Sequence, residues 1–503
     1  MNEKKRLDVS LIVPPTRAHT RRPPSSFLTL AAFLEQEGHS TEIVDFKVPS
    51  YTPLQGEALK KIENQVIQHV SKQNPAIVGL TCMSHEVDDV LELGKRIKEK
   101  SGAKIVVGGP HSNNEPQDLL FKNTPIDGVV IGEGELTFEE LVKRVKDGSD
   151  WQSTKSIAYW NGEQLVRTPK RELMDLDRLP IPAFEKIDMN YYTQPHVYAI
   201  RYLLLSSFYV FSSRGCPWNC NFCSFRTAWD YNANRKPIRY RSVKNVVDEI
   251  ELLVKKYHVD AVYMYDDDFC IWKKRVLEFA EELEKRELNI LWACETRVDE
   301  VSDEMLSAMK HSGCIQLDFG VESGSQRSLD AVNKQTSVED ARNAFRMCHK
   351  QGIRTFANFM FNTPNETEED VAQTMKFAKE IQATEYSFGI MTPYAGSELY
   401  KELSINMTPE DLESLKEAEW VLNPKFVVAK HKLDLSELVA KAMIQLNSPL
   451  NQLRYPDSII QYVKKLSTSR KKGSYLNSMT ALTSFAIKSR IPRLLAKNLS
   501  PYK

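Results

Sequence analysis

Three cysteines with a short, fixed spacing follow directly after an apolar segment of this chain. The run from Leu203 to Phe211 has the length of a buried strand, and the cysteines come after it as C-x-x-x-C-x-x-C. Thiolates this close together can converge on one soft metal centre, and three of them leave a four-coordinate site one ligand short. A cubane iron–sulfur cluster held by three cysteines keeps one iron free for a reactive molecule. The spacing therefore predicts a [4Fe-4S] site whose ligands are Cys216, Cys220 and Cys223.

Two other uses of these cysteines fit the sequence less well. A zinc site of three cysteines would need a fourth ligand, and no histidine follows at zinc spacing. The remaining five of the eight cysteines are scattered singly. Such usage suits a reducing compartment, where disulfides are rare, and each single cysteine is expected to be a small core residue.

The composition is that of a soluble protein. A length of 503 residues predicts about three domains, and the formal net charge of zero gives no reason to expect nucleic-acid binding. The first residues lack the apolar core of a signal peptide, and no run of apolar residues is long enough to cross a membrane. We therefore expect a cytoplasmic protein.

The first 150 residues alternate between strand-like and helix-like segments, which predicts a doubly wound α/β sheet of parallel strands. The expected strands cover residues 9–13, 41–46, 76–81, 104–107 and 126–131, with helices at 27–36, 57–72, 87–100 and 136–145. Ligands of such sheets bind beyond the carboxyl ends of the strands. The segments at three of those ends carry glycine or small polar residues that let a ligand approach the backbone. The candidate binding residues there are Thr81, Ser84, Gly108, Gly109, His111, Gly132 and Glu133.

A second alternation covers residues 201–400. Strands are expected at 207–212, 261–265, 290–294, 315–319, 355–361 and 386–391, with helices at 243–257, 275–286, 303–311, 338–351 and 368–381. Strand–helix barrels carry their active sites at the carboxyl ends of the strands. The cysteines follow the first strand, so the metal motif and the topology agree.

Charged residues follow other strands of the second unit. Asp266 and Asp267 belong to a run of three aspartates after the second strand, where like charges favour binding of cations or hydroxyls, although a solvated turn is the alternative. Arg297 follows the third strand and could bind a carboxylate or form a structural ion pair. Glu322 and Ser323 follow the fourth strand, and Lys334, eleven residues beyond Ser323, is expected at the surface.

These motifs together resemble the cobalamin-binding branch of the radical S-adenosylmethionine enzymes. The resemblance rests on the cysteine motif, the Gly-Gly-x-His and Gly-Glu-Gly-Glu strand ends, the proline-bearing linker from Leu176 to Phe184, and the segment Gly320-Val-Glu-Ser-Gly324. It implies a Rossmann-like cobalamin-binding domain at 1–150, a linker at 151–200 and a partial (β/α)6 barrel at 201–400. A helical region with a basic tail would follow at 401–503.

The resemblance also implies roles for single residues. Phe222 would pack on the adenine of S-adenosylmethionine, and Arg297, Glu322 and Ser323 would hold its polar groups. Asp266 and Asp267 would stand at the catalytic face. The strand ends of the first domain would hold cobalamin. The chain lacks the D-x-H-x-x-G motif that supplies a lower cobalt ligand in many cobalamin proteins, so no such ligand is expected from that position.

One loop departs from the family pattern. Where the family usually has Gly-x-Pro-Gly-Glu-Thr, this chain has asparagine at both glycine positions, Asn362 and Asn365. Asparagine is the residue that next best tolerates left-handed backbone angles. The loop is therefore expected to keep its place after the fifth strand.

By resemblance, the protein cleaves S-adenosylmethionine reductively and transfers a methyl group through cobalamin to an unactivated carbon. The alternatives are radical cyclisation, rearrangement or oxidation without methyl transfer, and a carrier of cobalamin or cluster that is not an enzyme. The substrate could be a small molecule, a lipid or a peptide, and the electron donor would be a flavodoxin or ferredoxin. After Asp457 come ten Lys or Arg residues and no acidic residue, so the tail could contact an anionic membrane peripherally.

Overall fold

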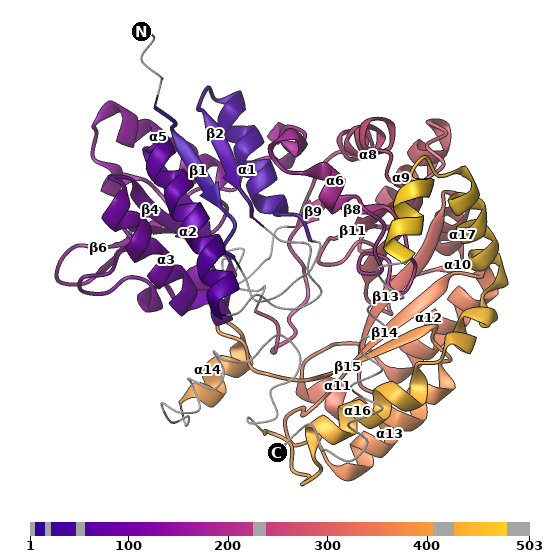
Figure 1. Cartoon of the computed structure of the whole chain (residues 1–503). Helices are drawn as coiled ribbons and strands as arrows, with labels where there is room; N and C mark the ends of the chain where they lie inside the picture. Colours follow the sequence, from indigo (N-terminus) through magenta and orange to yellow (C-terminus); the bar gives the residue numbers. More distant parts are fainter. Residues whose placement is uncertain are drawn as a thin grey trace.

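The computed structural model describes residues 6–15, 22–46, 56–224, 238–405, 408 and 427–479. Figure 1 shows two α/β bodies side by side, the first in indigo to purple and the second in magenta to orange. The C-terminal helices α16 and α17, in yellow, lie against the second body. The architecture is the predicted one, with an N-terminal sheet domain followed by a strand–helix barrel.

The first body is built on a seven-stranded sheet with the order β2-β1-β3-β4-β5-β6-β7. The strands are β1 (Val9–Ile12), β2 (Thr41–Val44), β3 (Ile77–Thr81), β4 (Lys104–Gly108), β5 (Gly128–Val130), β6 (Ile157–Trp160) and β7 (Leu165–Arg167). All pairs from β2 to β5 are parallel. Their order is that of a flavodoxin-like doubly wound sheet, which places loops of consecutive strands along one carboxyl edge.

Helices cover both faces of this sheet. They are α1 (Ser25–Gln36), α2 (Gly56–Gln73), α3 (Val87–Lys100), α4 (Pro110–Asn114) and α5 (Glu135–Asp147). Side chains of α1 and α5 share one apolar cluster and those of α2 and α3 share another, so each helix pair covers its own face. In α3 the buried residues recur every three or four positions, as in Val90, Leu93 and Ile97, which is the pattern of a helix packed on one side.

The first sheet continues beyond residue 150, into the segment that we assigned to the linker. Strands β6 and β7 form an antiparallel hairpin on the outer side of β5. The chain then passes through single helical turns at Leu176–Arg178 and Phe184–Lys186 and through α6 (Met189–Tyr192) to the second body.

The second body holds six parallel strands in the order β15-β14-β13-β12-β11-β8. The strands are β8 (Ser207–Val210), β11 (Ala261–Met264), β12 (Leu291–Thr296), β13 (Cys314–Glu322), β14 (Arg354–Phe361) and β15 (Glu385–Ile390). The helices between them are α8 (Val243–Tyr257), α9 (Lys273–Lys285), α10 (Asp303–His311), α11 (Gln326–Ala331), α12 (Val338–Gln351) and α13 (Glu368–Glu380). Side chains from β12, β13 and β14 pack with those of α10, α12 and α13 in one large apolar core. This is the expected six-stranded partial barrel.

Two very short strands stand apart from this sheet. Strands β9 (Ser213–Arg214) and β10 (Arg239–Tyr240) form an antiparallel ribbon, in which Arg214 and Arg239 are direct partners. Strand β9 lies immediately before the three cysteines in the chain and β10 follows them, so β9 sets where their loop begins.

Helices continue after the last barrel strand. They are α14 (Glu398–Ser404), α16 (Leu435–Leu446), a 3₁₀ segment at Pro449–Arg454 and α17 (Pro456–Thr468). Parts of the helical region expected at 401–503, namely residues 409–426 and residues 480–503 of the basic tail, lie outside the described residues. Within the part of the chain that the structure describes, no helix is long and apolar enough to cross a membrane.

The loop after β14 confirms the prediction for its two asparagines. Asn362 and Asn365 have φ angles of +72° and +61°, the left-handed values that glycine would adopt. The buried Asn362 side chain also accepts hydrogen bonds from the backbone amides of Val428 (2.9 Å) and Ala429 (3.1 Å). It donates to the carbonyl of Met391 at 3.0 Å. Asparagine therefore keeps the backbone shape of glycine and in addition ties the C-terminal segment to the barrel.

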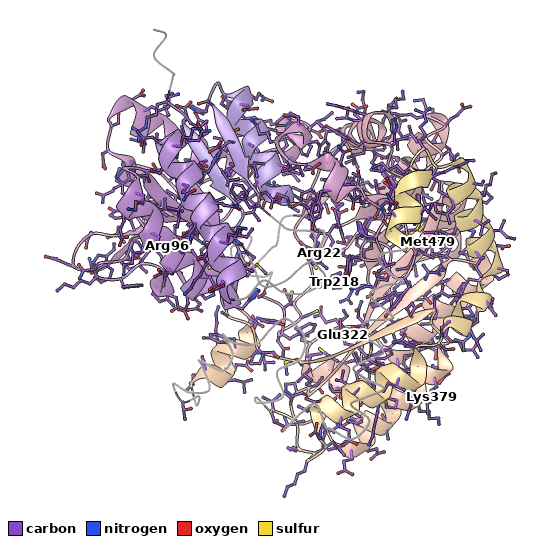
Figure 2. The ribbon with its side chains drawn as sticks, in the orientation of Figure 1. Arg22, Arg96, Trp218, Glu322, Lys379 and Met479 are labelled. Carbon is purple, nitrogen blue, oxygen red and sulfur yellow. The ribbon has the colours of Figure 1, made fainter. Side chains whose placement is uncertain are left out.

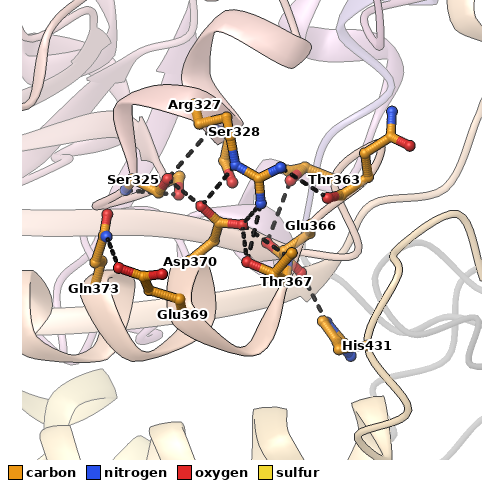
Figure 3. Close-up of polar contacts among 12 residues, drawn as sticks. Ser325, Arg327, Ser328, Thr363, Glu366, Thr367, Glu369, Asp370, Gln373 and His431 are labelled. Atoms are coloured by element: carbon orange, nitrogen blue, oxygen red, sulfur yellow. Dashed lines mark hydrogen bonds and ion pairs between the residues drawn. The ribbon is translucent and has the colours of Figure 1, made fainter.

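A buried contact between a histidine and a carboxylate strengthens the same attachment. His431 Nε2 lies 3.1 Å from Glu366, and both side chains are fully buried. Figure 3 shows this contact beside Arg327 of helix α11, which reaches Asp370 and Thr367. The loops after β13 and β14 and the segment that begins at residue 427 thus form one polar network.

The Asn362→Gly variant tests this attachment. Glycine accepts the backbone angles without strain but leaves the amides of Val428 and Ala429 without their acceptor, so we expect a loss of about 2 kcal/mol of unfolding free energy. Asn365→Gly is the matched control, because Asn365 is exposed and has the same left-handed backbone. Chemical denaturation of both variants measures the difference. Equal stability of the two variants would contradict the proposed role of the Asn362 side chain.

Candidate active site

The three cysteines lie on the loop that follows β8 and β9, at the carboxyl end of the barrel. In the described structure all three are outside disulfide bonds, and all are partly buried. Gly215, directly before Cys216, has a φ of +103°, which only glycine adopts without strain. Burial raises the pKa of the Cys216 thiol to about 12, so a bound cation is needed to hold it as the thiolate that ligates metal.

The Asp266 carboxylate holds this loop in place. It accepts hydrogen bonds from the backbone amide and hydroxyl of Ser212 (2.8 and 2.7 Å) and from the amide and hydroxyl of Ser213. Asp266 is buried, and burial raises its pKa. The adjacent Asp267 accepts a hydrogen bond from the Gly215 amide at 3.2 Å. Both aspartates, which we predicted at the catalytic face, therefore contact the backbone of the cluster loop.

The donor set fits a cubane cluster. Each cysteine of a cubane binds a different iron atom, so the three sulfurs do not need to meet around one ion. Among the described residues, no three His, Cys, Asp or Glu side chains are close enough to hold a single metal ion. The three cysteines would hold the cluster, which supplies the electron for reductive cleavage when it is bound.

Arg297 lies over the cluster loop. Its guanidinium is 3.8 Å from the centre of the Trp218 ring, between the first and second cysteines. Asp299 accepts two hydrogen bonds of 2.9 Å from the same guanidinium. Its remaining donors reach the carbonyls of Lys334 and Gln335, at 2.8 and 3.2 Å. Arg297 is therefore held by protein groups at the place where a carboxylate ligand was predicted.

Lys334 corrects one expectation from the sequence. We expected a surface lysine, but Lys334 is 6% exposed and its ammonium group is 2.8 Å from the Glu322 carboxylate. Burial alone would lower the pKa of Lys334, and the charge of Glu322 raises it above its usual value. The carboxyl end of β13 thus carries a buried ion pair. Glu322, the last residue of this strand, has a left-handed φ of +65°.

Ser323, next to Glu322 in the chain, and Phe222 contact other protein side chains. The Ser323 hydroxyl is 2.9 Å from that of Thr374 and is buried. Phe222 packs against an apolar cluster that includes Met360 and Leu399. Figure 2 shows Trp218 and Glu322 along the side of the barrel that faces the first body, with Arg22 above them. A nucleoside contact by Phe222 or Ser323 stays a prediction.

Sequence reasoning missed Asp268, although it named the aspartate run. Burial raises the pKa of Asp268 to about 6, and its carboxylate accepts a 2.8 Å hydrogen bond from Thr296. Trp218 and Asp299 were also missed. Their only signal was that each lies within two residues of a predicted site residue, Cys220 or Arg297.

The predicted cobalamin residues gather at the carboxyl edge of the first sheet. A side chain at Gly109, which has a φ of +107°, would meet Thr81 Oγ1 at 2.8 Å and the backbone of Cys82. Gly108 and Gly132 have open space where a side chain would stand. This edge therefore offers the bare backbone that a large flat cofactor requires, and it would hold cobalamin on the face toward the barrel.

His111 forms a hydrogen bond through Nδ1, while Nε2 lies near a carboxylate without forming a hydrogen bond among the described residues. Nδ1 is 3.1 Å from the Ser84 hydroxyl, and Nε2 is 3.3 Å from the Asp118 carboxylate. The ring is 2% exposed. The Ser84 hydrogen bond holds the ring in place, and a cofactor contact by His111 stays a prediction.

Glu133 of the first body forms ion pairs with residues of the second body. Together with Glu135 it forms ion pairs with Arg214 and Arg239 of the barrel ribbon. Two further contacts cross the boundary, from Asn114 to the carbonyl of Ala395 (2.9 Å) and from Arg22 to the hydroxyl of Tyr265 (3.0 Å). The carboxyl edges of the two sheets therefore meet at the cluster loop.

The fold and the site define an enzyme class: a metal-cluster barrel joined to a domain that binds a flat cofactor. Two family models match, the B12 binding domain over residues 17–142 and the radical SAM superfamily over residues 210–378. An uncharacterized methyltransferase of Pyrococcus horikoshii is 30% identical over 406 residues, covering 78% of this chain and 83% of its own. The chain belongs to the cobalamin-binding radical S-adenosylmethionine enzymes, and its cofactors are a [4Fe-4S] cluster, S-adenosylmethionine and cobalamin.

Other relatives span two activities. The anaerobic magnesium-protoporphyrin IX monomethyl ester cyclase of Rubrivivax gelatinosus is 30% identical over 84% of this chain and 72% of its own. Among solved structures, the methyltransferase TsrM from Kitasatospora setae, with cobalamin and cluster bound, has a TM-score of 0.63. The two share 19% identity, and the match covers 80% of each chain, so this likeness shows the fold. The relatives thus include methyltransferases and a cyclase, and what the chain shares with all of them is the radical S-adenosylmethionine enzyme class.

The ligand assignment predicts the behaviour of single cysteine variants. Cys216→Ala, Cys220→Ala and Cys223→Ala are each expected to lose most of the bound iron after anaerobic reconstitution, because a cubane with two protein ligands is poorly held. Cys348→Ala is the control, since this cysteine is buried among helix side chains of the barrel core. Iron analysis and the visible spectrum measure the result. Full iron content in any of the three variants would remove that cysteine from the ligand set.

The buried pair predicts a role for Lys334 in binding S-adenosylmethionine. In the Lys334→Met variant the Glu322 carboxylate loses its cation and its fixed position, so we expect affinity for S-adenosylmethionine to fall about tenfold. Lys244→Met is the control, because the Lys244 side chain is 78% exposed on a distant helix. Equilibrium dialysis with the reconstituted protein measures the affinity. An unchanged affinity in Lys334→Met would show that Glu322 does not contact the ligand.

Proposed function

We propose that the protein transfers a methyl group to an unactivated carbon of its substrate. The methyltransferases among its relatives support this, including the cytidylyl-2-hydroxyethylphosphonate methyltransferase of Streptomyces wedmorensis, which is 25% identical over 74% of this chain. Such a carbon has no leaving group or lone pair, so its hydrogen must be removed before a methyl group can be attached.

The observation that carries the proposal is the meeting of the two carboxyl edges. Glu133, directly beyond β5 of the first sheet, contacts Arg214, which is two residues before Cys216. Cofactors on these edges would face the same space. A substrate between them could lose a hydrogen atom on one side and receive a methyl group on the other, as proximity catalysis requires.

Cluster-dependent cleavage of S-adenosylmethionine supplies the radical that abstracts hydrogen, and cobalamin supplies the methyl group. The chain's own residues position these reagents. Asp266 and Asp267 fix the cluster loop, while Arg297 and the Lys334–Glu322 pair place charged groups beside the second cysteine. The aspartates, in this proposal, act by positioning and need not touch the substrate.

A second candidate function is radical cyclisation or oxidation without methyl transfer. The likeness to the Rubrivivax cyclase, with the same identity as the Pyrococcus methyltransferase, favours this alternative. Both activities use the same cleavage of S-adenosylmethionine. They differ in whether the product gains the mass of a CH2 group.

We further propose that a flavodoxin or ferredoxin supplies the electron and that the substrate is a small molecule, a lipid or a peptide. The basic tail remains a candidate for peripheral membrane contact. Leu476 and Met479 are exposed on its first, described part, which fits that proposal, and residues 480–503 lie outside the described range.

Metal and corrinoid analysis is the first test. We expect about four irons and one cobalt per chain after expression with cobalamin and anaerobic reconstitution. With methyl-deuterated S-adenosylmethionine, a bound substrate from cell extract is expected to gain a labelled methyl group, which mass spectrometry detects.

The other outcomes separate the alternatives. Formation of 5'-deoxyadenosine with an unlabelled product would favour cyclisation or oxidation. Bound cobalt and iron without any 5'-deoxyadenosine would identify a carrier and overturn the enzymatic proposal.

A further inference from the structure

Four charged side chains form a nearly closed cluster between the first domain and the cysteine loop. Arg214 donates to Glu135 at 2.6 and 3.2 Å and lies 3.2 Å from Glu133. Arg239 also pairs with Glu133 and donates to the carbonyl of Met174 at 2.6 Å. Each of the four side chains is at most 17% exposed. We name this set the edge clamp.

The β9–β10 ribbon is electrostatically unfavourable by itself, because it places two arginines side by side. Arg214 and Arg239 are direct partners of the antiparallel pair β9–β10, and like charges placed directly opposite one another destabilise a strand pair. Both arginines are largely shielded from water, which weakens the screening of their repulsion. The ribbon therefore needs anions from elsewhere.

The anions come from the first domain. Glu133 and Glu135 belong to the Gly-Glu-Gly-Glu turn between β5 and α5, at the edge where cobalamin is expected. Burial acts to raise the pKa of Glu135, but the charge and hydrogen bonds of Arg214 lower it below its usual value, so Glu135 is ionised. Two carboxylates and two guanidiniums thus balance across the boundary, and Glu133 contacts both arginines.

We propose that the edge clamp is a positioning device through which the cobalamin-binding domain holds the cluster loop in its ligating shape. Arg214 is followed by Gly215 and Cys216, so a ribbon that opens displaces the first cluster ligand. The cluster site is in this sense completed by the other domain. The inference goes beyond the proposed reaction and does not depend on it, because it concerns retention of the cluster and not turnover.

The test measures how quickly the reconstituted full-length protein releases iron. The probe is a water-soluble ferrous-iron chelator, added anaerobically in the absence of S-adenosylmethionine, and the loss of cluster absorbance is followed. In Glu133→Gln the two arginines keep only one carboxylate, so we expect iron release about tenfold faster than in the wild type. Glu140→Gln is the matched control, because Glu140 pairs with two arginines inside the first domain, Arg144 and Arg171.

A compensating variant separates charge balance from general loss of structure. In Glu133→Gln/Arg239→Met one carboxylate and one guanidinium remain, so the repulsion is gone and iron release should return to within about twofold of the wild-type rate. A purely structural effect would make the double variant as fast as Glu133→Gln or faster. Either that result, or wild-type release by Glu133→Gln, would overturn the proposal. Circular dichroism before each assay confirms that the variants are folded.

Discussion

The loop of the three cysteines depends on one buried carboxylate. Asp266 stands beyond β11 and accepts hydrogen bonds from Ser212 and Ser213, which follow the neighbouring strand β8. A carboxylate in a buried position is costly unless several donors satisfy it, and four donors do so here. The desolvation cost of this carboxylate is offset only when the loop adopts the conformation that brings these four donors to it. The backbone that leads into the metal ligands is therefore fixed by the protein's own hydrogen bonds.

The charges around the loop suit an anionic cluster. Three thiolates bring negative charge into a partly buried site, and such charge must be balanced nearby. Arg297 and Lys334 both lie close enough to Cys220 for its charge to raise their pKa values. Each cation is in turn fixed by its own carboxylate, Asp299 or Glu322. The charges around the site therefore alternate with distance from the cysteines: the negative thiolates, then the two cations, then the carboxylates that hold those cations.

The regular elements could be predicted because their patterns are local. Helix α3 covers the predicted residues 87–100, and the left-handed asparagines follow from the backbone preferences of that residue type. The buried Lys334 could not be predicted, because a lysine in a polar loop looks solvated until its partner, twelve residues earlier, is known. Arg214 and Glu135 are 79 residues apart in the chain. Nothing in the sequence between them indicates that a strand end of one domain faces a loop of the other.

The β6–β7 hairpin decides where the chain leaves the first domain. Residue Ile157 pairs with Val130, so β6 begins at the carboxyl edge and runs back, and β7 returns to that edge. A chain with a single reversal would depart from the opposite side of the sheet. Because the chain reverses its direction twice, the segment after β7 leaves the sheet beside the cysteine loop. There the Met174 carbonyl accepts a hydrogen bond from Arg239, and the Asp177 carboxylate accepts one from the amide of Ser242. A peripheral hairpin thereby determines at which edge of the first sheet the chain leaves toward the second body.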